Sequence, residues 1–301
     1  MNPALTGYMA AVLGPLDDAA RRGVADDLTA LASTAASSAG LRAALTDTSI
    51  APTARRAVVA DLLEGKVAPP SARIAAFAAF AAQAQDVPVA LDDAAMHARH
   101  IAAHGVVEEV QVSVLAARAR VGGYASALFE ELHTEALEGV EDELFGWARA
   151  VADQPGLRGA LMNRDLPGAE RAGVVRDLLE GRVSAVTVSL ATYAILGGRP
   201  RDLVGILQWL VDRVAAERGW RVARVRAAMR IDDEAREALA ETLRALVGRP
   251  VELEVAEEPD LIGGALVEVG DLRVDATTRG RLEAIREQLK RDRRAARVGG
   301  I

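Results

Sequence analysis

The chain has 301 residues, a formal net charge of −7 and a hydrophobic fraction of 50%, with few aromatic residues and no cysteine. The lack of cysteine excludes disulfide bonds and thiolate catalysis, and the modest negative charge argues against nucleic acid as a partner. The longest apolar runs, such as residues 74–82, fall well short of the ~20 residues that span a bilayer. We therefore expect no direct membrane insertion.

Two long stretches of the sequence repeat one pattern at a constant offset. LRAAL at residues 41–45 recurs as LRGAL at 157–161, and VVADLLEG at 58–65 recurs as VVRDLLEG at 174–181, so both offsets are 116 residues. The same offset aligns Tyr8 with Tyr124, Ala11 with Ala127, Gly23 with Gly139, Leu28 with Leu144 and Phe77 with Tyr193. An ungapped register over about seventy residues indicates a duplicated helical unit.

The first copy covers residues 3 to about 105. Leucine, valine and alanine recur at spacings of three and four residues, which predicts a series of short helices. Pro52 lies where the first turn of a helix tolerates proline, and Gly65 follows the run Leu62-Leu63-Glu64, where a helix end favours a positive φ. Pro69-Pro70 is then expected to open the next helix.

The junction between the copies, residues 106–123, allows two interpretations. Residues 110–114 alternate like a strand, whereas residues 115–121 have a helical pattern. Gly122-Gly123 predicts a break before the second copy, which runs from about 124 to 219. Each copy is expected to form a bundle of about five or six helices.

The last eighty residues have a different pattern, typical of a small α+β domain. Asp232 is a candidate N-cap for an amphipathic helix, and residues 270–271 are expected to form a tight turn. The predicted strands are 222–231, 251–255, 261–269 and 272–274, and the third of them contains Gly263-Gly264. The predicted helices are 232–247 and 277–289.

The predicted fold is therefore mainly α, with two tandem all-α bundles followed by a small α+β C-terminal domain. The expected domains are residues 1–120 (first bundle plus junction), 121–219 (second bundle) and 220–301 (α+β domain).

Residues 259–282, PDLIGGALVEVGDLRVDATTRGRL, closely resemble the signature of the delta subunit of F-type ATP synthase, the oligomycin-sensitivity-conferring protein family. That signature has a double glycine in a strand, a Gly-Asp turn, an aspartate after an apolar residue, and Arg-Gly-Arg-Leu at the start of the last helix. The family usually has Gly-Ser where this chain has Ala276-Thr277. Residues 124–129 and 177–182 also resemble parts of the family's helical domain. Residues 124–301 therefore resemble one complete delta subunit, and residues 3–120 an extra copy of its helical domain.

The resemblance implies a non-catalytic stator subunit that links the catalytic head to the peripheral stalk. It implies that the helical domain binds N-terminal helices of α subunits and that the C-terminal domain binds one or two b chains. The expected location is the cytoplasmic face of the bacterial membrane, as a peripheral protein without a cofactor. The alternative is a generic helical adaptor outside ATP synthase. An enzyme is disfavoured because no catalytic set of side chains can be assigned.

Predicted partner-binding residues fall into two groups. A groove that accepts an amphipathic helix is expected between residues 124–138 and 184–196, with Tyr124, Leu128, Ala191 and Tyr193 as candidates and ordinary core packing as the alternative role. In the C-terminal domain the candidates are Gly263, Gly264, Arg279 and Leu282. The first copy is expected either to add a second contact to the head, which raises avidity, or to brace the stalk.

Two further patterns suggest ligands but have simpler explanations. His97, His100 and His104 lie on one helix face, where zinc would need a further ligand such as Glu108. A solvated or interfacial face is the favoured explanation, and we expect no metal. The basic tail, with Lys290 and Arg294, could pair with an acidic stalk helix or with lipid head groups, but a solvated helix end is the favoured explanation.

Overall fold

The computed structural model describes residues 1–105, 112–219, 222–247, 251–258, 261, 263–269 and 272–275. The chain divides into two compact units, Met1–Ala215 and Ala216–Ile301, and each is described by itself. Among the described residues, no helix combines the length and apolar character that a membrane span requires.

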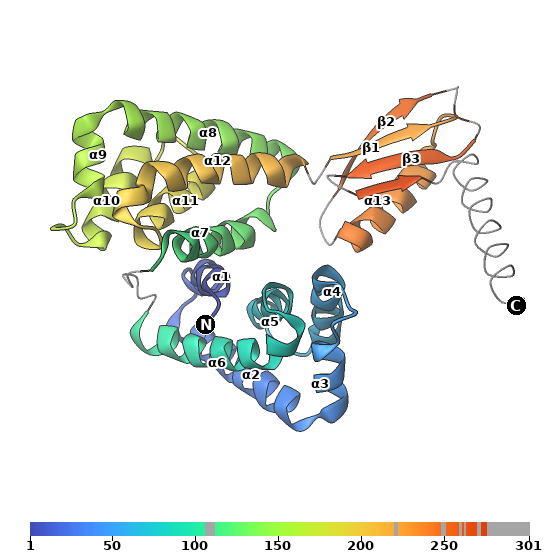
Figure 1. Cartoon of the computed structure of the whole chain (residues 1–301), viewed down its shortest axis with the longest axis horizontal. Helices are drawn as coiled ribbons and strands as arrows, with labels where there is room; N and C mark the ends of the chain where they lie inside the picture. The colour runs from blue at the N-terminus through green and yellow to red at the C-terminus, as the bar shows by residue number, and fades with distance from the viewer. Residues whose placement is uncertain are drawn as a thin grey trace, which may run out of the picture. The chain divides into compact units, whose positions relative to one another are not determined.

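The first unit contains two bundles, each made of six described α-helices (Figure 1). The first bundle consists of α1 (Pro3–Leu13), α2 (Asp18–Ser37), α3 (Ala39–Thr46), α4 (Pro52–Leu63), α5 (Pro69–Ala81) and α6 (Val87–His104), with the 3₁₀ helix η1 (Ala84–Asp86) before α6. The second consists of α7 (Val114–Phe129), α8 (Thr134–Asp153), α9 (Pro155–Met162), α10 (Gly168–Leu179), α11 (Ala185–Leu196) and α12 (Leu203–Gly219), with η2 (Pro200–Asp202) before α12. The predicted pair of helical bundles is confirmed.

The duplication extends to the boundaries of the helices. Helices α2, α3 and α4 begin at residues 18, 39 and 52, and α8, α9 and α10 begin 116 positions later, at 134, 155 and 168. Gly65 and Gly181 end equivalent helices with φ of 67° and 72°, as expected for a residue without a Cβ. The repeated leucines Leu28 and Leu144 are both fully buried, so each bundle has its own core.

The first helices of the two bundles, α1 and α7, pack against each other at repeat-equivalent glycines. A Cβ on Gly7 would lie 1.8 Å from the carbonyl oxygen of Arg120, and a Cβ on Gly123 would lie 1.8 Å from that of Ala4. Because Gly7 and Gly123, and likewise Ala4 and Arg120, are related by the 116-residue offset, the two bundles contact each other as the halves of a two-fold dimer do.

The predicted break at Gly122-Gly123 is wrong, because α7 runs through both residues without interruption. A Cβ on Gly122 would meet the Trp209 ring at 2.8 Å, and Gly123 lies against the main chain of α1. These glycines serve close packing rather than chain reversal, and packing contacts offset their low helix propensity. The undecided junction is helical from Val114 onward.

The second unit is a four-stranded sheet with one described helix. It contains β1 (Val222–Ala227), α13 (Asp233–Val247), β2 (Glu252–Glu257), β3 (Ala265–Val269) and β4 (Leu272–Asp275), in the strand order β2-β1-β3-β4. Strands β1 and β2 are parallel and are connected through α13, whereas β3 pairs antiparallel with both β1 and β4. Ala223, Val225, Leu243, Leu253 and Val267 form its buried core.

This α+β architecture is confirmed, with two local differences. Asp232 caps α13 as predicted, since its carboxylate accepts from the backbone N–H of Ala235 at 2.8 Å. Strand β1 ends at Ala227 rather than at 231, and Gly263-Gly264 precedes β3 instead of lying inside it, with φ of 76° and 81°. The predicted turn at 270–271 and helix at 277–289 lie outside the described residues.

Candidate functional site

The expected groove of the second bundle is centred on a stacked pair of tyrosines. Tyr124 of α7 and Tyr193 of α11 stack with ring centroids 3.8 Å apart and an interplanar angle of 8°. Their repeat equivalents in the first bundle, Tyr8 and Phe77, stack in the same way at 4.0 Å and 9°. The aligned aromatic residues therefore join the first and fifth helices of each bundle.

The four predicted groove residues differ in how much surface they offer. Ala191 is fully buried and Tyr193 is 3% exposed, so both belong to the core. Tyr124 and Leu128 are half-buried. The single helix expected over residues 124–138, on one side of the groove, is divided between two helices, because α7 ends at Phe129 and α8 begins at Thr134. Tyr124 and Leu128 therefore provide the accessible part of this surface.

A pocket of about 310 Å³ opens beside the tyrosine pair. It is bounded by α7, α10 and α11 of the second bundle and by the end of α1. Two arginines line it, Arg21 of α2 and Arg176 of α10, together with the buried Thr192 and with Gly14 at the end of α1. The Thr192 hydroxyl has no hydrogen-bond partner in the described part of the chain.

The equivalent place in the first bundle is filled by an acidic side chain. Glu130, at the end of α7, accepts a hydrogen bond from the Tyr8 hydroxyl at 2.8 Å and pairs with Arg56 and with Arg73. Arg73 also donates to the carbonyl oxygen of Ala127 at 2.8 Å. Burial and the nearby Glu130 carboxylate both raise the pKa of Tyr8, so its hydroxyl stays a donor at physiological pH.

Sequence reasoning missed this cluster, although the repeat contains a signal for it. Glu130 of the second copy aligns with Gly14, and Arg73 of the first copy aligns with Ser189, so neither charge is repeated in the other copy. A charged residue at one position of a repeat and glycine at the other marks a contact that the copies do not share. The difference leaves Tyr8 fully buried and Tyr124 half-buried.

A second repeated contact ties the second helix of each bundle to its fifth. In the first bundle Asp27 accepts hydrogen bonds from the Ala68 backbone N–H and the Ser71 hydroxyl, at 3.1 Å and 2.6 Å. In the second bundle Glu143 accepts from the Ser184 backbone N–H at 3.0 Å and from the Thr187 hydroxyl at 2.6 Å. These carboxylates hold the start of the helix that carries Phe77 or Tyr193.

Glu143→Gln is expected to reduce both the stability of the second bundle and its dependence on pH. Partial burial alone would raise the pKa of Glu143, but hydrogen bonds from Thr187 and Ser184 outweigh it and hold the pKa below its usual value. A lowered folded-state pKa stabilises the fold above the unfolded-state pKa, about 4.3, and this contribution is lost as pH falls through the folded-state value. Urea unfolding should show a loss of about 1 kcal/mol at pH 7 and a smaller difference from wild type below pH 4; an equal difference at both pH values would contradict the assignment.

The histidine cluster lies on one face of α6, as the spacing predicted. The rings of His100 and His104 stack at 4.6 Å, and His97 lies 6.4 Å from His100. Burial, together with the charges of His100 and Arg120, lowers the pKa of His97. Across the described residues, no three histidine, aspartate or glutamate side chains are grouped closely enough to hold a metal ion, and Glu108 lies outside them.

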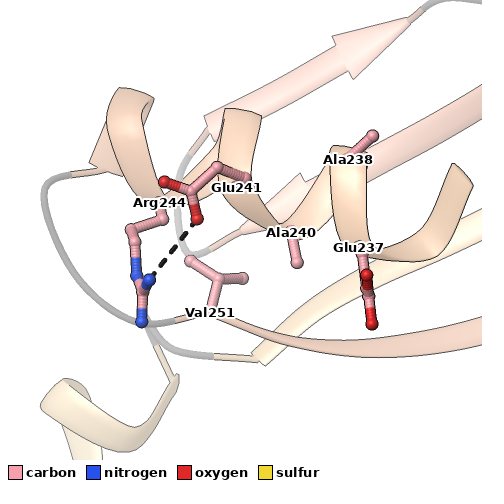
Figure 2. A pocket seen from close by; sticks show the side chains of 6 residues that line it. All are labelled: Glu237, Ala238, Ala240, Glu241, Arg244 and Val251. Atoms are coloured by element: carbon pink, nitrogen blue, oxygen red, sulfur yellow. Dashed lines mark hydrogen bonds and ion pairs between the residues drawn. The ribbon is translucent and has the colours of Figure 1, made fainter. Parts of the chain in front are cut away.

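In the second unit, Gly263 and Gly264 are both exposed ahead of β3, while Arg279 and Leu282 lie outside the described residues. Figure 2 shows a shallow hollow formed by one face of α13 and by Val251, which precedes β2. Glu241 and Arg244 form an ion pair across its edge at 3.4 Å. Both side chains are exposed, so this pair contributes little stability.

The comparisons with known proteins agree on one family. The family model described as ATP synthase delta (OSCP) subunit matches residues 121–289. The chain is 35% identical over 272 residues to the ATP synthase subunit delta of Kineococcus radiotolerans, which covers 90% of this chain and 88% of that protein. It is 31% identical to the subunit delta of Parafrankia sp., with the same coverage. It is 39% identical over 154 residues to that of Nocardia farcinica, covering 51% of this chain and 56% of the relative.

The family match begins within α7 and contains α8–α12 of the second bundle and β1–β4. The longer alignments also cover most of the first bundle, so the helical duplication lies within the length of two delta-subunit relatives. The C-terminal signature, the helical domain and the full-length similarity lead to the same conclusion. The chain belongs to the ATP synthase delta (OSCP) subunit family and is a peripheral-stalk subunit with a duplicated helical domain.

Proposed function

We propose that this subunit ties the catalytic head of the ATP synthase to the b stalk, so that the head does not turn with the rotor. In this proposal the second bundle binds the N-terminal helix of an α subunit through Tyr124 and Leu128. The observation that carries it is that Tyr124 of the second bundle is half-buried beside a pocket, whereas its equivalent in the first bundle, Tyr8, is fully buried.

The surface at Tyr124 and Leu128 suits an amphipathic helix. A partner helix that docks beside a hollow buries more apolar surface area than one that docks on a flat surface. Removal of this apolar area from water provides the binding free energy. In the first bundle Tyr8 is fully buried and Val12, which aligns with Leu128, is 7% exposed. Little apolar surface is left there for a partner, which favours a bracing role for the first bundle over a second head contact.

The second unit is proposed to bind the end of the b stalk, in one or two chains, through the surface that includes Gly263 and Gly264. The support is family membership, together with the exposed, positive-φ conformation of both glycines ahead of β3. In this assignment the protein works by binding on two sides and catalyses no reaction. It would lie at the cytoplasmic face of the membrane, held there by the rest of the complex.

Leu128→Glu is expected to weaken binding of a synthetic α-subunit N-terminal peptide to the full chain at least tenfold. A carboxylate in an apolar contact loses hydration without gaining a partner, and a tenfold change corresponds to about 1.4 kcal/mol. The measurement is a calorimetric titration with wild type, Leu128→Glu and the control Val58→Glu. Val58 is 49% exposed on α4 of the first bundle.

Equal affinity of the wild type and Leu128→Glu would contradict the proposed site, as would an equal loss with Val58→Glu. Reconstitution of each variant into the ATP synthase gives a second measurement. Leu128→Glu should lower proton-driven ATP synthesis while ATP hydrolysis by the isolated head is unchanged.

A further inference from the structure

We propose that the pocket beside Tyr124 and Tyr193 binds a carboxylate, supplied by an aspartate or glutamate side chain of the helix that docks on the second bundle. The source of the carboxylate rests on the function proposed above, whereas the chemistry of the pocket rests on the structure of this chain alone.

The first argument is the repeat itself. Related by the 116-residue offset, the first bundle closes its equivalent place with the Glu130 carboxylate, which meets the Tyr8 hydroxyl and two arginines. The position equivalent to Glu130 is Gly14, which has no side chain to offer. The second bundle therefore has a pocket at the repeat-equivalent position, but this pocket lacks the internal carboxylate that fills its counterpart in the first bundle.

The second argument is a buried hydroxyl that lines the pocket. Thr192 is 7% exposed, and within the described ranges its Oγ1 makes no hydrogen bond. Its repeat equivalent, Ala76, is a buried alanine that has no such group. Buried polar atoms nearly always have partners, and the Oγ1 atom has almost no accessible surface of its own. A ligand atom in the pocket therefore accepts from this hydroxyl only after the Thr192 side chain rotates toward it.

The third argument is the charge around the pocket. Arg21 is fixed at the end of α1 by donating to the carbonyl oxygens of Leu13 and Gly14, at 3.0 Å and 2.7 Å, and it also pairs with the exposed Asp18 at 3.3 Å. Arg176 of α10 also lines the pocket and is exposed. Ala172, which aligns with Arg56, lies one helical turn before Arg176. The second bundle thus places arginines around the pocket from positions that differ from those of the first.

These features favour a carboxylate over a phosphate group. The pocket adjoins the C-terminal end of α1, where the helix dipole disfavours additional negative charge. A singly charged group with an apolar stem suits two arginines, one hydroxyl and the accessible Tyr124 ring better than a dianion does. An acidic residue on an amphipathic helix has this composition, because its methylene groups would lie on the Tyr124 ring while its carboxylate reaches Arg176 and, once the Thr192 side chain has rotated, the Thr192 hydroxyl.

The test uses the full chain and a small probe whose only charge is a glutamate side chain, N-acetyl-L-glutamic acid 1-amide. Its neutral counterpart is N-acetyl-L-glutamine amide, and inorganic phosphate is the third ligand, all at constant ionic strength. In ¹H–¹⁵N NMR spectra, the glutamate probe is expected to shift the amide signals of Ser189, Thr192 and Tyr193 saturably, with a dissociation constant of about 1 mM or weaker.

Thr192→Val, which keeps the shape of the side chain, and Arg176→Gln should each weaken probe binding at least threefold. The control is Arg182→Gln, which removes an exposed arginine from the turn after α10, outside the pocket. Binding by this control should equal that of the wild type, and all variants should give the dispersed spectrum of a folded chain.

The proposal is overturned if the glutamine probe causes the same shifts, if phosphate saturates the site more tightly, or if both pocket variants bind like the wild type. A dissociation constant below about 0.01 mM for the free probe would indicate a small-molecule site and overturn the assignment to a partner's side chain. If the chain binds the probe but not the α-subunit peptide, the α-subunit helix is not the source of the carboxylate, whereas the carboxylate pocket itself is supported. Failure of the proposed function is therefore distinguishable from failure of the pocket assignment.

Discussion

Gly123→Ala is expected to destabilise the first unit by about 3 kcal/mol or more, because the new methyl group overlaps main-chain atoms of another helix. Its Cβ would lie 1.8 Å from the carbonyl oxygen of Ala4, and backbone cannot move aside as a flexible side chain can. Helices α1 and α7 must then separate along their shared contact. In thermal unfolding this corresponds to a fall of about 6–12 °C for a unit of this size.

The control for this prediction is Gly139→Ala, a glycine inside α8 that has no atom within 4 Å of its would-be Cβ. Alanine has the higher helix propensity, so this variant should be unchanged or more stable by about 0.5–1 kcal/mol. If Gly123→Ala behaves like Gly139→Ala, the two bundles do not contact each other as described.

The repeat equivalent Gly7 provides a further check on the same contact. Gly7→Ala should cost about as much as Gly123→Ala, since its Cβ would lie 1.8 Å from the carbonyl oxygen of Arg120. The double variant should cost less than the sum of the two single variants, because one substitution already separates the helices and relieves the second overlap. Additive costs would indicate two independent contacts.

Glu130→Gln is expected to cost about 2–3 kcal/mol and to loosen the closure of the first bundle. The side chains of Glu130, Arg56 and Arg73 are 25%, 24% and 31% exposed, so the substitution removes a shared anion from two partly buried guanidinium groups, of which Arg73 keeps only the exposed Glu131. The Tyr8 hydroxyl keeps a neutral acceptor but loses a charge-assisted hydrogen bond. Urea unfolding monitored by circular dichroism gives the free-energy change.

The neighbouring Glu131 provides a closely matched control. It also pairs with Arg73, but its side chain is 69% exposed, so Glu131→Gln should cost less than about 1 kcal/mol. The two variants remove the same charge from adjacent residues, and Glu130 differs from Glu131 in its burial and in its additional contacts with Tyr8 and Arg56. Equal costs would show that Glu130 acts as an ordinary surface charge and would remove the structural basis for calling the first bundle closed.

Much of the architecture could be predicted from local patterns. The spacing of leucine and alanine indicates helices because one face of each must be buried, and the alternation at residues 251–255 indicates a strand in the second unit. Proline and glycine at Pro52, Gly65 and Gly181 mark helix ends through their own φ preferences, which need no tertiary contact. The 116-residue repeat and the C-terminal signature were sufficient for the family.

The roles of several residues could not be predicted, because they depend on neighbours far along the chain. Gly122-Gly123 has the local signature of a break, yet contacts with Ala4 and Trp209 keep it helical. Ala191 and Tyr193 have the spacing of a groove, yet both are in the core.

The sequence by itself determined the duplication, the helical bundles, the α+β unit and the family, because hydrophobic periodicity and backbone preferences act over a few residues. Only the tertiary structure decided that α1 and α7 pack glycine to backbone and that Glu130 closes one bundle while Gly14 leaves the other open. The physical reason is that a carboxylate or a missing Cβ acquires its role from the atoms placed against it, and here those atoms belong to the other copy of the repeat.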